Sequence, residues 1–430
     1  MTTASERSRG TEPYFDRGVT DRIKGALIAL MFFHHAFTFP AWIVSGAGYP
    51  FLASLTPELS RATRICVGAF AFLSGMLACW QPRRGAKAGI ARDLRRATDF
   101  LLSYWAVYAL LLLSAKLAGR AVLDPVRILY DLVGLRQDIM TFNWYVPFFL
   151  LSLPCLRLLS GAMDRGPLAG VFCGIFLPCG VFTVLASLCG AGGARGGEFF
   201  TALAHVFENA RDCFPALACG YLCARHNVFG RIFERELTGG LRSAAAKKAL
   251  CAALLVLCCA GRYVFPAAEW KTGEIFGRSW TFRLSMDAVL APLFVWGLAV
   301  LFKSGTASRA DPSDVRAGPV SRALGAVFGA MGKLSMLMWF FSCAFFNVCR
   351  DLTQPVLYAP RFAPLVFAWG LALCFAASFL TDLWLKKLLA LKNRLLFPSS
   401  LPTPAGISSG GRGSRNDGAD PGKTGSGEGG

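Results

Sequence analysis

The stretch DRIKGALIALMFFHHAF, residues 21–37, decides the fold of this chain. It begins with charged residues, turns apolar from Gly25, and then places His34 and His35 side by side within the apolar run. Similar apolar runs of about 17–25 residues recur along the sequence, and that length spans a lipid bilayer. The pattern predicts an all-α, polytopic membrane protein.

The composition of the chain supports this prediction. Of its 430 residues, 54% are hydrophobic and 17% are charged, with a mean hydropathy of +0.47. A soluble domain carries about 25% charged residues. Ten segments long enough to span a membrane are predicted. They cover residues 24–42, 62–80, 98–117, 143–160, 168–189, 205–223, 247–265, 284–302, 331–348 and 362–385.

The distribution of basic residues predicts the orientation. With the N-terminus in the cytoplasm, the inner segments hold 31 of the 45 Lys and Arg residues. Short inner loops of membrane proteins carry such an excess, so both termini are expected inside. The net charge of +19 is therefore read as a topology signal with some contact to anionic lipid. Nucleic-acid binding would need a basic face on a soluble module, and none is predicted.

Three regions are expected. Residues 1–20 form a polar cytoplasmic segment without the features of a signal peptide. Residues 21–396 form a ten-helix membrane domain. Residues 397–430 are rich in Gly, Ser and Pro and are expected to be a disordered cytoplasmic tail. The 15 cysteines lie mostly in apolar runs, and no pattern has the spacing of a metal site.

The two adjacent histidines are the first candidate site. His35 lies eleven residues after Lys24, about 16 Å along a helix and near the middle of the membrane. An ionisable residue at that depth is a functional-site hypothesis by default, and a neutral imidazole suits general base catalysis. The alternative is a histidine hydrogen-bonded across packed helices. Neighbouring side chains point about 100° apart, so one of the two is expected to be structural.

Two further patterns lie near the predicted inner side. Ser74 and Gly75 are small, so they allow a helix or a ligand to approach closely; helix packing is the simpler explanation. Arg92 and Arg95 form an R-x-x-R pair one helical turn apart in a basic loop. Such a pair suits a phosphate group, whereas the alternative is a cluster that only sets topology.

The predicted outer side carries aromatic and acid–base candidates. Trp144 and Tyr145 lie where an aromatic belt is expected, and Asn143 could reach a cavity. His205 and Glu208 are three residues apart on one helix face. A solvated, self-paired helix end explains that pair more simply than an acid–base site does.

In order and spacing, these motifs resemble the acyltransferase 3 family of integral membrane acyltransferases. In that family the first helix begins with an Asp. A basic residue follows three positions after the Asp, and a Gly comes directly after the basic residue. A His lies eleven residues after the basic residue. This chain has Lys24 where Arg is usual and Asn143 where His is frequent. The matching residues are Asp21, Lys24, Gly25, His35, Leu73, Ser74, Gly75, Arg92, Arg95, Trp144 and Tyr145.

The resemblance implies an enzyme of the bacterial inner membrane. It would take an acyl group, usually acetyl, from cytoplasmic acetyl-CoA and pass it to a hydroxyl of an exported or surface carbohydrate, with no permanently bound cofactor or metal. His35, Lys24 and Asp21 would be catalytic, with His35 acting as a base or as a transient acyl carrier.

The remaining site residues are assigned on the same basis. Arg92, Arg95 and Ser74 would bind acyl-CoA, and Asn143, Trp144 and Tyr145 would face the acceptor. A partner protein could complete transfer outside. Two alternatives stay open, namely a transporter or flippase of a glycan or lipid intermediate, and an acyltransferase acting on lipids or proteins.

Overall fold

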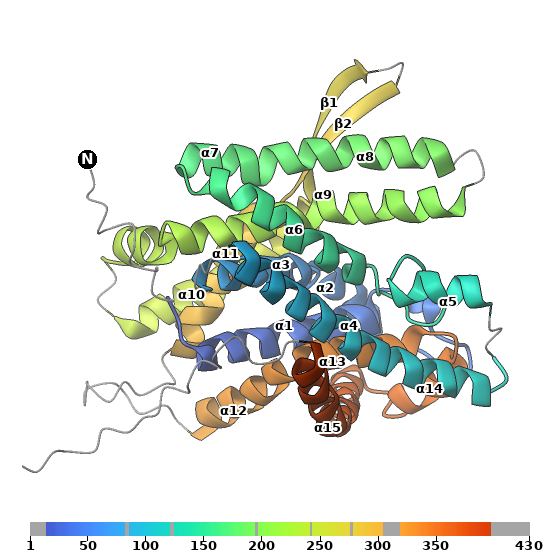
Figure 1. Ribbon diagram of the computed structural model, residues 1–430. Coiled ribbons are helices and arrows are strands. Elements are labelled where there is room, and N and C mark those ends of the chain that lie inside the picture. The colour runs from blue at the N-terminus through green and yellow to red at the C-terminus, as the bar shows by residue number, and fades with distance from the viewer. Residues whose placement is uncertain are drawn as a thin grey trace, which may run out of the picture.

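The computed structural model describes residues 14–81, 86–120, 124–193, 197–240, 243–275, 278–303 and 319–396. Most of the expected segment 1–20 and all of the expected tail 397–430 lie outside this part of the chain. The described chain is almost entirely helical (Figure 1). Its α-helices are α1 (Arg17–Phe37), α2 (Thr56–Ala62), α3 (Ile65–Trp80), α4 (Ala86–Leu117), α5 (Pro125–Leu132), α6 (Tyr145–Met163), α7 (Pro167–Val171), α8 (Leu177–Gly193), α9 (Glu198–Arg225), α10 (Ala244–Val264), α11 (Asp287–Lys303), α12 (Pro319–Lys333), α13 (Ser335–Ser342), α14 (Arg350–Leu357) and α15 (Ala363–Leu396).

Short elements of other kinds join these helices. Two π-helical segments, η3 and η4, and three 3₁₀ segments, η1, η2 and η5, occur among the described residues. Their bounds are η1 (Pro40–Trp42), η2 (Ala53–Leu55), η3 (Phe172–Phe176), η4 (Phe229–Leu237) and η5 (Cys343–Phe346). One antiparallel hairpin, β1 (Ala267–Ile275) and β2 (Arg278–Ser285), joins α10 to α11 and extends past α8 in Figure 1. The sequence pattern did not predict this hairpin, because the expectation was all-α.

Several of the described helices are long and apolar enough to cross a membrane. Six pass by length and composition, and a seventh passes if a bent helix pair counts as one span. Five of the six are α4, α6, α10, α15 and the continuous stretch from α7 to α8, and the sixth is Ala53–Trp80, which ends with α3. The protein is therefore a helical membrane protein.

The bent pair corrects one expected segment. Residues 331–348 were predicted to form one continuous span. Instead α12 ends at Lys333, α13 begins at Ser335, and the two helices meet at an angle of 75°. The start of α13 is thereby turned towards the interior of the bundle, where it contributes to the candidate site.

The basic region before the third expected span is also different from the expectation. It was read as a loop, but α4 already begins at Ala86 and runs for 32 residues. Arg92 and Arg95 therefore belong to a continuous helix. Arg92 is half-buried, whereas Arg95 is exposed.

The helix α1 lies inside the bundle. Its N-cap residue Asp16 accepts a hydrogen bond of 2.7 Å from the backbone N–H of Val19, which satisfies one of the unpaired groups of the first turn. The helix packs against α3, α11, α12, α13 and α15. This central place explains why α1 carries polar groups such as His35 without exposing them to lipid.

Glycines allow two helix pairs around α1 and α3 to pack closely. A Cβ atom added to Gly25 would lie 1.9 Å from the carbonyl oxygen of Phe328 on α12. On α3, a Cβ atom added to Gly75 would lie 1.8 Å from the carbonyl oxygen of Leu217 on α9. Contact at such short range is open only to small residues. These contacts set the positions of the helices that carry the candidate site.

The Gly75→Ala variant should fold poorly. Its new methyl group overlaps the α9 backbone, so the helices must separate, at a cost of about 1–3 kcal/mol or more. The control is Gly161→Ala on α6, where no atom lies within 4 Å of the added Cβ. We expect Gly161→Ala to match or exceed the parent in yield and melting temperature in detergent, since Ala favours helix over Gly. Equal behaviour of the two variants would contradict this packing role.

Candidate active site

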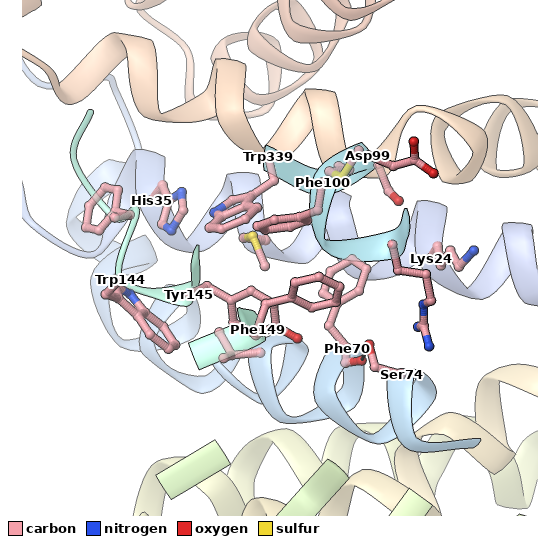
Figure 2. Close-up of a pocket in the computed structure, with 16 residues that line it drawn as sticks. Lys24, His35, Phe70, Ser74, Asp99, Phe100, Trp144, Tyr145, Phe149 and Trp339 are labelled. Carbon is pink, nitrogen blue, oxygen red and sulfur yellow. Dashed lines mark hydrogen bonds between the residues drawn. The ribbon is translucent and has the colours of Figure 1, made fainter. Parts of the chain in front are cut away.

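A cavity of about 360 Å³ lies between α1, α3, α4, α6 and α13 (Figure 2). Most of its wall is aromatic or aliphatic, and the polar groups gather towards its two ends. Figure 2 shows His35 and Trp144 at one end and Lys24 and Asp99 at the other. We call these the histidine end and the basic end. The lining residues are Lys24, Met31, His35, Val67, Phe70, Ser74, Arg96, Asp99, Phe100, Phe142, Trp144, Tyr145, Phe149, Ser335, Met336 and Trp339.

The imidazole of His35 is held in one tautomer. Its Nδ1 lies 3.3 Å from Oγ of Ser342, and the Ser342 hydroxyl donates its hydrogen to the carbonyl oxygen of Trp339 at 2.6 Å. A hydroxyl has a single hydrogen, so Ser342 can only accept from His35 Nδ1–H. The neutral ring then carries its lone pair on Nε2. His35 is only 7% exposed and lines the cavity, which is the arrangement a proton acceptor needs.

The neighbouring His34 has a different role. Its Nδ1 lies 2.7 Å from the carbonyl oxygen of Ser60 and 2.9 Å from Oγ1 of Thr38. The hydroxyls of Thr38 and Ser60 are 2.7 Å apart. These bonds connect the end of α1 to α2, and His34 is not among the cavity residues. Of the two histidines, His35 belongs to the site and His34 to the scaffold.

A second cavity of about 560 Å³ lies at the start of α1, beside the basic end. Lys24 and Arg96 line both cavities. Arg17 and Lys333 add positive charge to the second cavity, and Asp16 and Asp21 add negative charge. Asp21 is buried and lies 3.6 Å from Lys24 Nζ. A mainly cationic chamber therefore adjoins the cavity that contains His35.

The R-x-x-R pair does not line either cavity. Neither Arg92 nor Arg95 is a lining residue, whereas Arg96, the next residue along α4, lines both. Asp93, on the same turn, is taken up by an ion pair with Arg157 of α6. Asp93 also acts on Arg96 through its charge, although no ion pair joins the two among the described residues. Arg96, and not Arg92 or Arg95, is therefore the arginine of α4 that lines the cavity of His35.

Ser74 reaches the cavity as the small-residue motif suggested. Its hydroxyl donates to the carbonyl oxygen of Phe70 at 2.9 Å, one helical turn earlier, and leaves its lone pairs for other partners. Gly75 faces away, towards α9. The motif thus serves both helix packing and the cavity wall.

The acceptor-side candidates divide in a similar way. Trp144 and Tyr145 line the cavity near its histidine end. Asn143 is fully buried outside the cavity wall, and its Nδ2 donates to Tyr104 Oη at 2.9 Å and to the carbonyl oxygen of Arg136 at 2.7 Å. Asn143 therefore shapes the segment before α6 and does not face the cavity.

The buried carboxylate of Asp131 also holds the segment before α6 in place. Asp131 accepts hydrogen bonds from the backbone N–H groups of Asp138 and Ile139 at 3.2 and 3.3 Å, and from the Tyr108 hydroxyl. Burial raises the pKa of Asp131 above its ordinary value. The segment that these bonds fold ends in Phe142, whose φ of +66° lies in the left-handed region. That conformation costs a bulky residue about 1–3 kcal/mol, so the surrounding contacts must impose it.

The pair His205 and Glu208 is distant from this site. Their side chains lie 3.1 Å apart on the exposed first half of α9, and neither lines the cavity. The arrangement fits the solvated, self-paired helix end. No group of three or more His, Cys, Asp or Glu side chains in the described ranges is placed to hold a metal ion.

Sequence reasoning missed several residues of the wall. Arg96 lies four positions before Phe100 and eight before the buried Tyr104, so it belongs to the inward face of α4. That helical phase was a usable signal. Ser335, Met336 and Trp339 carried no such signal, because the break before α13 directs them inward.

Comparisons of the chain with protein-family models, curated proteins and solved structures find no match.

Proposed function

We propose that this protein is a membrane acyltransferase that moves an acetyl group from cytoplasmic acetyl-CoA to a hydroxyl of a cell-surface or exported carbohydrate. One observation carries the proposal: His35 and the cations Lys24 and Arg96 line a single cavity inside a helical membrane protein. The motif resemblance to the acyltransferase 3 family supports the choice of reaction.

The proposed division of labour follows the two ends of the cavity. Lys24 and Arg96, with the cationic second chamber, would hold the phosphates of the donor, because charge-assisted hydrogen bonds to phosphate are strong. The thioester arm would then extend along the aromatic wall towards His35. Asp21 would keep Lys24 in place through their contact at 3.6 Å.

The proposed chemistry needs one proton acceptor. His35 Nε2 removes the proton of the acceptor hydroxyl as its oxygen attacks the thioester carbonyl. The new C–O bond forms, the C–S bond breaks, and the thiolate of CoA takes the proton back from the imidazolium. In the alternative route the acetyl group rests on Nε2 before the hydroxyl attacks. Both routes require the tautomer that Ser342 holds.

The proposed topology has ten crossings with both termini in the cytoplasm of a bacterium. Besides the seven candidate spans, α1, α9 and α11 have 21, 28 and 17 residues. At 1.5 Å per residue these helices are about 32, 42 and 26 Å long, near the thickness of the hydrocarbon layer. The second half of α9 is almost continuously buried, so this part of the helix lies inside the bundle. Reporter fusions after Gln81 and Leu396 should both report the cytoplasm.

A transporter or flippase of a glycan or lipid intermediate is the second candidate. The 75° break between α12 and α13 favours it, since discontinuous helices form substrate sites in many transporters. The test is to supply purified protein in vesicles with labelled acetyl-CoA and a glycan acceptor. Label appearing on the glycan, with release of free CoA, supports the enzyme. Movement of the glycan across the vesicle without acetyl transfer would favour the transporter.

A further inference from the structure

A column of stacked rings begins at the histidine end of the cavity. Phe142 lies face to face with His35, with ring centroids 4.2 Å apart and an angle of 9° between the planes. Trp42 stacks on Phe142 at 5.3 Å and 25°, and Phe39 stacks on Trp42 at 4.2 Å and 17°. The column thus leads from the imidazole to the end of α1 opposite the basic chamber.

Exposure increases along this column. His35 is 7% exposed, Phe142 and Trp42 are half-buried, and Phe39 is 36% exposed. The column therefore connects a buried catalytic candidate to the molecular surface. Phe142 is the ring that separates His35 from the rest of it.

The backbone of Phe142 is held in place by neighbouring polar groups. Its N–H donates to Oε1 of Gln137 at 3.0 Å, and the hydroxyl of the preceding Thr141 donates to the carbonyl oxygen of Phe346. These bonds maintain the positive φ of Phe142, a conformation that non-glycine residues rarely adopt. Such an imposed conformation at a site is an observation that points to function.

We propose that Phe142 is a positioning and specificity-determining residue: its ring stacks on the His35 imidazole and shuts the histidine end of the cavity against water until a carbohydrate acceptor displaces it. This inference rests on the proposed acetyl transfer. Water and a sugar hydroxyl are both nucleophiles towards a thioester, so an open site would hydrolyse the donor. A ring that moves only for the acceptor favours transfer over hydrolysis.

The first test compares hydrolysis with transfer. Phe142→Ala should hydrolyse acetyl-CoA without an acceptor roughly tenfold faster than the parent, because removing the gate admits water. Phe142→Gly should also speed this hydrolysis, and Gly adopts the positive φ of this position without strain. Phe142→Tyr should hydrolyse acetyl-CoA as slowly as the parent, because the tyrosine ring can still stack on His35. Phe39→Ala, at the far end of the column, should hydrolyse like the parent. Unchanged hydrolysis in Phe142→Ala would overturn the proposal.

The second test does not depend on catalysis. A His35→Cys variant is treated from the acceptor side with a membrane-impermeant thiol reagent, with the parent chain as the control for native cysteines. The added thiol should be labelled only when Phe142→Ala is also present. Equal labelling with and without Phe142 would overturn the gate whatever the reaction is. A gate that opens as expected, in a protein that never transfers acetyl groups, would instead overturn the proposed function.

Discussion

Replacing His35 by Ala is expected to reduce acetyl transfer by about 10²-fold or more while leaving the protein folded. A positioned general base contributes about 10²- to 10⁴-fold to the rate, and a nucleophile at the same position would be needed absolutely. The side chain lines a cavity, and its one side-chain hydrogen bond among the described residues is to Ser342, so we expect its loss to leave helix packing intact. The measurement is transfer of labelled acetyl to glycan by purified variants at equal concentration.

Two further variants make the expectation for His35 sharper. Ser342→Ala should lower the rate less than His35→Ala, because it removes the group that fixes the tautomer but not the base. His34→Ala should lower the melting temperature, because it breaks the connection between α1 and α2. Full transfer by a folded His35→Ala variant would remove His35 from the mechanism. An unfolded variant would be replaced by His35→Gln, which preserves size without a titratable group.

The helical membrane fold followed from sequence because hydrophobic length is a local property. The run after Gly25 and the similar runs along the chain each carry their own signal, and the structure has a helix at each of the ten predicted positions, one of them broken. The break at Leu334 and the hairpin after α10 gave no such signal. The break and the hairpin both depend on which helices pack against these positions. Residues far apart in the sequence determine that packing.

The candidate site shows the same limit at finer scale. His35 was found because an imidazole in an apolar run is rare. Arg92 and Arg95 were chosen for their spacing, which says only that two side chains share a helix face. Which face turns inward depends on the phase set by Phe100 and Tyr104, and that phase brings Arg96 to the cavity. Phe142 was missed because its stacking on His35 joins residues far apart in the chain.

Arg96→Ala is expected to weaken the use of acetyl-CoA more than any other arginine change on α4. Arg96 lines both the cavity of His35 and the cationic chamber. Removing a hydrogen bond that involves a charged group costs about 1.5–3 kcal/mol, which corresponds to a rise of about 10- to 100-fold in KM for the donor. The maximal rate should fall much less, because Arg96 is distant from the reacting atoms at the histidine end.

The matched control is Arg95→Ala, one residue away on the same helix. Arg95 is exposed and lines neither cavity, so its loss should change KM by about fivefold or less. Arg96→Lys should fall between the two, since Lys keeps the charge but loses the planar, two-pronged contact with phosphate. A KM that rises for Arg95→Ala and not for Arg96→Ala would return donor binding to the R-x-x-R pair. Because KM for the glycan acceptor should stay constant in all three variants, the experiment also separates donor binding from general damage to the bundle.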